Sequence, residues 1–169
     1  LEGIANQRNV TLYSIRRMGK TALIKHVFHK LRQADQATPL YVDLMPTDNF
    51  DELTGKLTEA IIHQFGLPEK GLSRKLQKLL SAIGASLSFD PVTGMPVVSV
   101  QFHEPKQVDQ SLTALLNFLA NEKQQIVLAF DEFQQITNYP ESNPEAFIRH
   151  LVQEFNSIRF IFSGSHKGI

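Results

Sequence analysis

The sequence predicts an α/β domain with three layers, in which helices cover both faces of a mainly parallel β-sheet. Short apolar runs of strand type alternate with longer segments whose apolar residues recur every three or four positions, as in amphipathic helices. One run, residues 126–130, is apolar at every position, which is typical of a strand buried on both faces. A change to period two near residues 85–102 interrupts this alternation and predicts an inserted β-hairpin.

The individual elements follow from these patterns. Four runs have the composition of core strands, at residues 9–13, 40–44, 126–130 and 158–162. Helical spacing of apolar residues predicts a helix over 20–33, and Thr47 or Asp48 is suited to cap the next one. The same spacing predicts three more helices, near residues 72–83, 108–119 and 144–155.

The predicted hairpin has two open interpretations. It could be a contact device, or it could be a packed edge of the main sheet. Its tip, residues 90–96, carries one acid and no lysine or arginine, which argues against a wedge that grips DNA.

Composition limits the function. The 169 residues suffice for one domain with a core, and 17 basic residues balance 17 acidic ones. Nucleic acid is therefore not indicated as a partner by net charge, and neither is an anionic membrane. The lack of cysteine excludes disulfides and thiolate chemistry, and no apolar run reaches the roughly 20 residues that cross a bilayer. We predict a cytoplasmic protein. Because the chain begins without methionine and stops just after an apolar run, we expect residues 1–169 to be a truncated domain.

The clearest motif lies between the first predicted strand and the first predicted helix. Its order of residues is that of a phosphate-binding P-loop, in which backbone N–H groups and a helix N-terminus surround phosphate. We expect the nucleotide-binding residues to be Ser14, Ile15, Arg16, Arg17, Met18, Gly19, Lys20, Thr21 and Ala22.

Three residues of this loop have defined chemical roles. Lys20 would reach the β- and γ-phosphates as a catalytic residue, and the hydroxyl of Thr21 would hold Mg²⁺. Gly19 lets the backbone approach phosphate closely. Ser14 stands where the motif has its first glycine, so the loop is either reshaped or binds nucleotide less tightly, with binding retained.

A second motif follows the apolar run 126–130. Asp131 and Glu132 come directly after it, which is the Walker B arrangement. Asp131 would hold Mg²⁺, and Glu132 would orient and deprotonate the attacking water. The long separation between Lys20 and Asp131 leaves room for another strand and helix, so the two strands need not be consecutive.

These residues resemble the archaeal-type ATPases, a family within the AAA+ and STAND group of P-loop ATPases. The Arg16-Arg17 pair, the Gly19-Lys20-Thr21 triplet and the stretch 131–133 are similar to the family pattern, and so is the Ser-Gly-Ser of residues 163–165. The resemblance implies ATP with Mg²⁺, a core strand order of 5-1-4-3-2 and switch-like behaviour. It also implies parts that we expect to be absent from this chain: strand 5, a helical lid and an effector domain through which the protein would meet a partner or another copy.

The same resemblance implies a sensor 1 residue, which lies between the Walker motifs and contacts water or the γ-phosphate. Ser165 is the first choice for this catalytic role and Ser163 is the second. The alternative is that both serines only form a turn that leaves the strand.

Three functions remain open. The first is an ATPase that is slow until a partner or the lid supplies an arginine finger. The second is a nucleotide-dependent switch or scaffold, and the third is the ATPase module of a DNA-associated protein. Several other polar residues are expected to have local or solvent-facing roles, including Arg16, Arg17, Asp43 and the pair His26 and His29, although Asp43 could also reach the metal site's outer shell.

Overall fold

Four parallel strands form the central sheet of the computed structural model, which describes residue 6 and residues 8–66, 73–89, 91, 96–100 and 105–166. The strands are β1 (Val10–Ile15), β2 (Thr38–Asp43), β5 (Ile126–Asp131) and β6 (Arg159–His166). Their order is β1-β6-β5-β2, and every pair is parallel. This is the 1-4-3-2 part of the expected core order, so the predicted fold class is confirmed.

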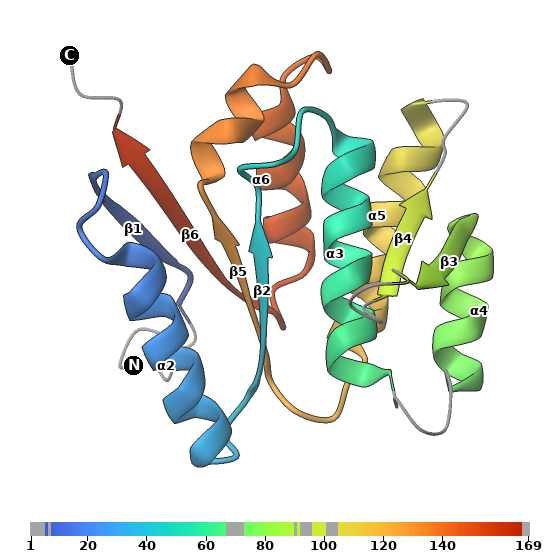
Figure 1. Ribbon diagram of the computed structural model, residues 1–169, viewed down its shortest axis with the longest axis horizontal. Coiled ribbons are helices and arrows are strands. Elements are labelled where there is room, and N and C mark those ends of the chain that lie inside the picture. The colour runs from blue at the N-terminus through green and yellow to red at the C-terminus, as the bar shows by residue number, and fades with distance from the viewer. Residues whose placement is uncertain are drawn as a thin grey trace.

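Helices cover both faces of this sheet, as Figure 1 shows. Alternate residues of β5 point to opposite faces: Val127 and Ala129 pack with α2, whereas Leu128 and Phe130 belong to the larger core on the other side. This double burial explains why β5 is apolar throughout. The helices are α2 (Lys20–Gln33), α3 (Phe50–Phe65), α4 (Arg74–Ala82), α5 (Pro105–Ala120) and α6 (Pro144–Glu154).

Two strands run further than the sequence predicted. Ser14 and Ile15 lie in β1 rather than in the loop, because they pair with Ser165 and His166 of β6. Residues 163–165 consequently lie within a strand, and the turn considered for them is wrong. The predicted strand stopped at Tyr13 because residues 14–19 were assigned to the phosphate loop, whereas the backbone pairing between β1 and β6 continues to Ile15 and His166.

The start of α3 also differs from the prediction. Its cap is Asn49, whose side chain accepts a hydrogen bond from the backbone N–H of Glu52 at 2.9 Å. Thr47 instead donates to the carbonyl of Leu44 and shares a hydrogen bond with the hydroxyl of Tyr139. A short 3₁₀ helix, η1 (Phe133–Asn138), follows β5 and has no clear signature in the sequence.

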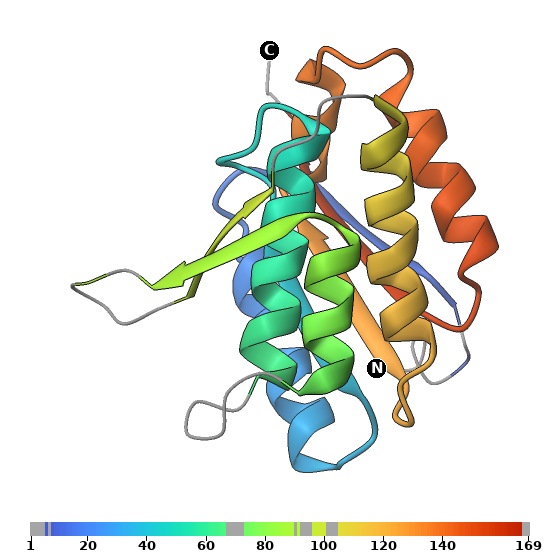
Figure 2. The same ribbon diagram turned by 90° about the vertical axis from the view of Figure 1, so that its right-hand side faces the viewer.

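The inserted hairpin forms a sheet of its own, which Figure 2 shows extending away from the helices. Its strands are β3 (Ala85–Phe89) and β4 (Pro96–Val100), and they pair antiparallel as predicted. Buried Val98 lies against α3, with its backbone carbonyl close to Gly55. The hairpin is therefore not an edge of the main sheet. Residues 90, 92–95 and 101–102, which include most of its predicted tip, lie outside the described residues.

Within the described ranges, no helix has both the length and the apolar character that crossing a membrane requires.

Candidate functional site

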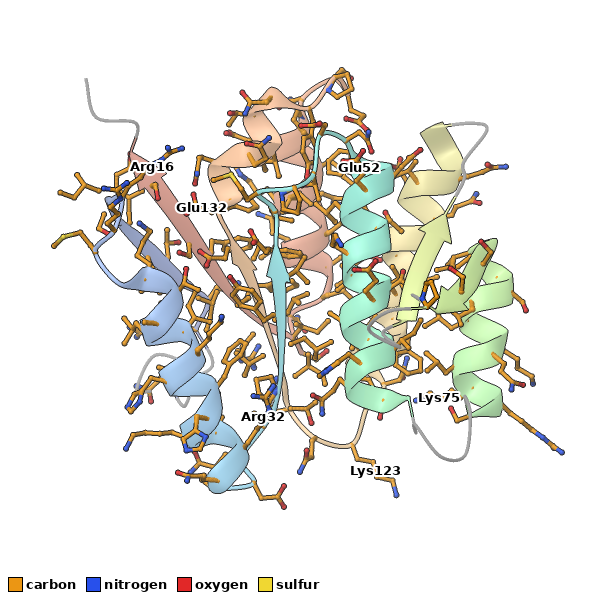
Figure 3. All side chains as sticks on the ribbon, viewed as in Figure 1. Arg16, Arg32, Glu52, Lys75, Lys123 and Glu132 are labelled. Carbon is orange, nitrogen blue, oxygen red and sulfur yellow. The ribbon has the colours of Figure 1, made fainter. Side chains whose placement is uncertain are left out.

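The predicted motifs meet at one edge of the sheet. Because β1, β5 and β6 are parallel, their carboxyl ends lie at the same edge, where open α/β sheets bind their ligands. The loop of residues 16–19 follows β1, Glu132 follows β5, and residues 163–165 lie near the end of β6. Figure 3 shows Arg16 and Glu132 at this shared edge, although they follow different strands.

The loop ends in a glycine that starts α2. Gly19 has a φ of 75°, a left-handed conformation that glycine adopts without the strain a side chain would cause. The first turn of α2 has neither a side-chain cap nor an acidic residue. The backbone N–H groups of Lys20, Thr21 and Ala22 therefore lack intrahelical partners and carry the positive end of the helix dipole. This is a local environment that attracts an anion.

Lys20 lies folded back against the end of β1. Its ammonium donates to the carbonyl oxygens of Ser14 at 3.3 Å and Ile15 at 3.2 Å. It also lies 3.4 Å from the Ser14 hydroxyl oxygen, an acceptor that a glycine at position 14 would not provide. All of these partners are neutral, so the charge of Lys20 is not neutralised by any of them.

Asp131 connects the two motifs. Its Oδ2 accepts hydrogen bonds from the hydroxyl of Thr21 at 2.5 Å and from the hydroxyl of Tyr41 at 2.8 Å. Its Oδ1 accepts a hydrogen bond from the backbone N–H of Glu132 at 3.0 Å. The structure thus brings together the two residues predicted to bind metal, which are 110 positions apart in the sequence.

These donors determine the charge state of Asp131. Burial alone would raise the pKa of Asp131, because it disfavours the charged form. The hydroxyls of Thr21, Ser163 and Tyr41 and the Glu132 N–H stabilise the carboxylate more strongly, so its pKa is lower than usual. The result is a buried, negatively charged oxygen ligand beside the start of α2.

Glu132 occupies a strained position next to it. Its φ is 54°, which is uncommon for a residue with a side chain and is often found at functional sites. One carboxylate oxygen accepts a hydrogen bond from the side-chain amide of Gln134. The other lies 3.5 Å from the hydroxyl of Ser165, at the long limit for a hydrogen bond.

The two candidate sensor serines lie beside different acidic residues, Ser163 beside Asp131 and Ser165 beside Glu132. Ser163 is fully buried, and its hydroxyl lowers the pKa of Asp131, although its Oγ makes no hydrogen bond of normal geometry within the described residues. Ser165 is associated with Glu132 instead, and its backbone N–H donates to the side-chain oxygen of Gln134 at 2.9 Å. The serines lie two positions apart on β6 and therefore point to the same face.

A cavity of about 460 Å³ lies in front of these groups. Its lining residues are Arg17, Met18, Gly19, Lys20, Thr21, Ala22, Lys25 and Glu132. Six of these residues belong to the predicted nucleotide-binding set and one is the predicted general base. The remaining members of that set, Ser14, Ile15 and Arg16, lie at the end of β1 or in the loop and do not line the cavity.

Other predicted residues have the local roles expected of them. Asp43 accepts a hydrogen bond from the backbone N–H of Met45 at 2.9 Å, which is a turn contact. Arg16 and Arg17 are exposed and form no ion pair with another described residue, and Arg17 has a φ of 65°. No group of three or more histidine, aspartate or glutamate side chains in the described part of the chain could hold a metal ion unaided.

Three residues at the site were not identified from the sequence. Tyr41 lies two residues before Asp43 on the same face of β2, and only the pairing of β2 with β5 places its hydroxyl against Asp131. The ammonium of Lys25 lies 5.6 Å from the centre of the Tyr41 ring, a cation–π contact at the cavity wall. Gln134 lies in η1, whose position could not be inferred from apolar spacing.

The sheet order, the loop before α2 and the acids at the end of β5 are those of a P-loop ATPase fold. The chain belongs to the family described as ATPase domains predominantly from Archaea, whose model matches residues 2–169. No curated protein matches the chain.

Solved structures of three archaeal proteins named Orc1, Cdc6p and ORC2 share the fold. The Orc1 protein of Aeropyrum pernix, solved in complex with DNA, has a TM-score of 0.59 and 15% identity over 98% of this chain and 36% of its own. Cdc6p from Pyrobaculum aerophilum has a TM-score of 0.53 and 16% identity, covering 94% of this chain and 32% of its own. The Aeropyrum pernix ORC2 protein, solved as ADPNP and ADP complexes, has a TM-score of 0.53 and 16% identity, covering 97% of this chain and 37% of its own. This chain thus spans about a third of each, and at these identities the likeness shows the fold alone.

Proposed function

We propose that this domain binds ATP together with Mg²⁺ at the carboxyl edge of its sheet and hydrolyses it slowly. The contact between Thr21 and Asp131 carries this proposal. The hydroxyl of Thr21, at the start of α2, lies 2.5 Å from the buried carboxylate of Asp131, at the end of β5. A metal ion that bridges the protein and a phosphate needs oxygen ligands from the protein, and Thr21 of α2 and Asp131 of β5 would supply them.

The residues present suit a polyphosphate. The free N–H groups at the start of α2 and the ammonium of Lys20 supply positive charge on one wall of the cavity. The contacts that Lys20 makes in this structure are to neutral oxygens, which it could exchange for phosphate without leaving a buried charge unpaired. The cavity volume of about 460 Å³ is within the range of small-molecule sites.

The residues also suit magnesium rather than a metal held by protein alone. Mg²⁺ prefers oxygen ligands, usually takes one or two from the protein and retains water and phosphate oxygens as the others. Thr21 and Asp131 provide two such oxygens, and the low pKa of Asp131 keeps it ionised. The buried hydroxyl of Ser163 beside Asp131 is available to orient a water in the outer shell. Mg²⁺, when bound, would neutralise charge on the phosphates.

Glu132 is the residue placed to act on water. It lines the same cavity as Lys20 and Thr21, so its carboxylate faces the space in which the terminal phosphate would lie. A carboxylate in this position can orient a water and take its proton. We propose Ser165, which lies beside Glu132, as the sensor 1 residue. We propose slow turnover because phosphoryl transfer often needs an arginine finger, and no arginine of this chain has been assigned that role.

The replacement Lys20→Ala tests the proposal directly. We expect it to abolish ATP binding, because the ammonium of Lys20 lines the cavity at the start of α2, where it would contact the β- and γ-phosphates. Lys30→Ala is a matched control, since Lys30 lies in the last turn of the same helix and is exposed. Binding is measured by calorimetry of the full chain with and without Mg²⁺. Unchanged ATP affinity in Lys20→Ala would contradict the proposed function.

A further inference from the structure

Gln134 makes contacts at the candidate site that none of the predicted roles explains. It lies in the first turn of η1, two residues after Glu132, and its side chain turns back toward the sheet. Its amide nitrogen donates to Oε2 of Glu132, and its amide oxygen accepts from the backbone N–H of Ser165 at 2.9 Å. One side-chain amide thus connects the carboxylate that follows β5 to the backbone at the end of β6.

The surroundings leave space for this bridge. A Cβ atom added to Gly164 would lie 3.2 Å from the amide oxygen of Gln134, closer than an ordinary van der Waals contact. Glycine at position 164 therefore allows the amide to reach the Ser165 N–H. The left-handed backbone of Glu132, with a φ of 54°, turns the chain into η1 at this point. Gly164 and the η1 geometry thus both permit the bridge.

We propose that Gln134 is a positioning residue that fixes the Glu132 carboxylate relative to the end of β6. This inference rests on the proposed function, in which Glu132 acts on water. With its Oε2 held by Gln134, Glu132 directs its other oxygen toward Ser165 and the cavity. Movement of β6 at Ser165 would shift the amide of Gln134 and hence the carboxylate. The bridge therefore links the candidate sensor to the candidate base.

Kinetics of the full chain test this role. We expect Gln134→Ala to lower kcat by about 10- to 100-fold, the size of effect that a misplaced catalytic group produces. ATP affinity should stay within about twofold of the wild type, because Gln134 does not line the cavity. Gln135→Ala is the matched control: Gln135 is the adjacent glutamine of η1, and its side chain reaches Asp48 at 3.5 Å instead. It should leave both kcat and affinity unchanged.

Two further variants separate the parts of the bridge. Gln134→Glu retains an acceptor for the Ser165 N–H but loses the donor to Glu132, so it should lower kcat while leaving Ser165 protected from hydrogen exchange. Gly164→Ala should displace the amide and lower kcat, with no further loss when it is combined with Gln134→Ala. These effects distinguish positioning from a general loss of stability, which thermal unfolding monitors in parallel.

Hydrogen exchange gives a readout that does not depend on ATP. In the nucleotide-free protein, Gln134→Ala should accelerate exchange of the Ser165 amide by about tenfold, because that N–H loses its acceptor. Unchanged exchange at Ser165, or a kcat for Gln134→Ala within twofold of the wild type, would overturn the positioning role. A wild-type chain that binds no ATP overturns the proposed function instead, so the two failures are distinguishable.

Discussion

At the scale of single residues, Asp131 has the most consequential environment. Its folded-state pKa is lower than its ordinary value of 3.8, because the hydrogen bonds it accepts outweigh the effect of its burial. A group with a lowered pKa stabilises the folded protein at pH values above the unfolded pKa. That stabilisation is lost as the pH falls from near 3.8 through the lower folded value. Acid should therefore destabilise the domain partly through this one carboxylate.

The replacement Tyr41→Phe tests this account of Asp131. It removes one donor and should lower the free energy of unfolding at pH 7 by about 1 kcal/mol, the net worth of a typical hydrogen bond. The loss should shrink toward zero at pH values below the folded pKa, where Asp131 is protonated. Urea unfolding at several pH values measures both effects.

The control for this prediction is the same replacement in an Asp131→Asn background, where the charge is absent. There Tyr41→Phe should have a much smaller effect at every pH. An equal loss in both backgrounds would mean that the Tyr41 hydroxyl contributes independently of the Asp131 charge, because phenylalanine keeps the ring and its contact with Lys25.

At the scale of elements, the start of α2 depends on one backbone conformation. Gly19 has a φ of 75°, and Gly84, at the end of α4, has a φ of 63°. A Cβ atom at either position would meet nothing within 4 Å, so alanine introduces backbone strain without a clash at both. The two glycines are thus a matched pair, one at the site and one remote from it.

We expect Gly19→Ala and Gly84→Ala to lower the free energy of unfolding by similar amounts, about 1 kcal/mol each. Only Gly19→Ala should weaken ATP binding, by about tenfold, because it tilts the N–H groups that face phosphate. Chemical denaturation and calorimetry measure these quantities. If both variants kept wild-type affinity, the backbone at Gly19 would not contribute to binding.

The elements also show what apolar patterns reveal and what they miss. Apolar spacing and composition predicted the helix that begins at Lys20 and the buried strand that ends at Asp131. The sequence motifs predicted the loop and the two acids between which we propose that ATP binds. The end of β1 was missed because Ser14 and Ile15 were assigned to the phosphate loop. The apolar pattern of β6 stops at Phe162, and only the family resemblance extends that strand to Ser165. Tyr41 and Gln134 were missed because Asp131 and Ser165, which they contact, lie on other strands that only the sheet order brings near them.

At the scale of the whole molecule, the open question is how ATP binding is used. An ATPase that does work needs turnover, whereas a switch needs only the bound state. Glu132→Gln should bind ATP within about twofold of the wild type, because the carboxylate is not a predicted phosphate contact. It should lose turnover by about 10²- to 10⁴-fold, the usual contribution of a general base.

Phosphate release and ATP-dependent thermal stabilisation of the full chain measure these two properties separately. If the output of the whole protein survives Glu132→Gln, ATP acts as a switch. Loss of output together with turnover would identify a hydrolysis-driven mechanism. Turnover that stays within tenfold of the wild type would show that another residue activates water.

The position of β6 between β1 and β5 fixes the spacing between the strand ends that form the site. Two strand spacings separate the loop that follows β1 from the acids that follow β5, a distance of about 10 Å. A ligand that extends along the sheet edge from the loop to Glu132 would lie over the end of β6, where Ser163 and Ser165 face the same way. Deleting a single residue from that strand would turn them to the opposite face. The register of β6 therefore decides whether the loop after β1 and the acids at the end of β5 can contact the same ligand.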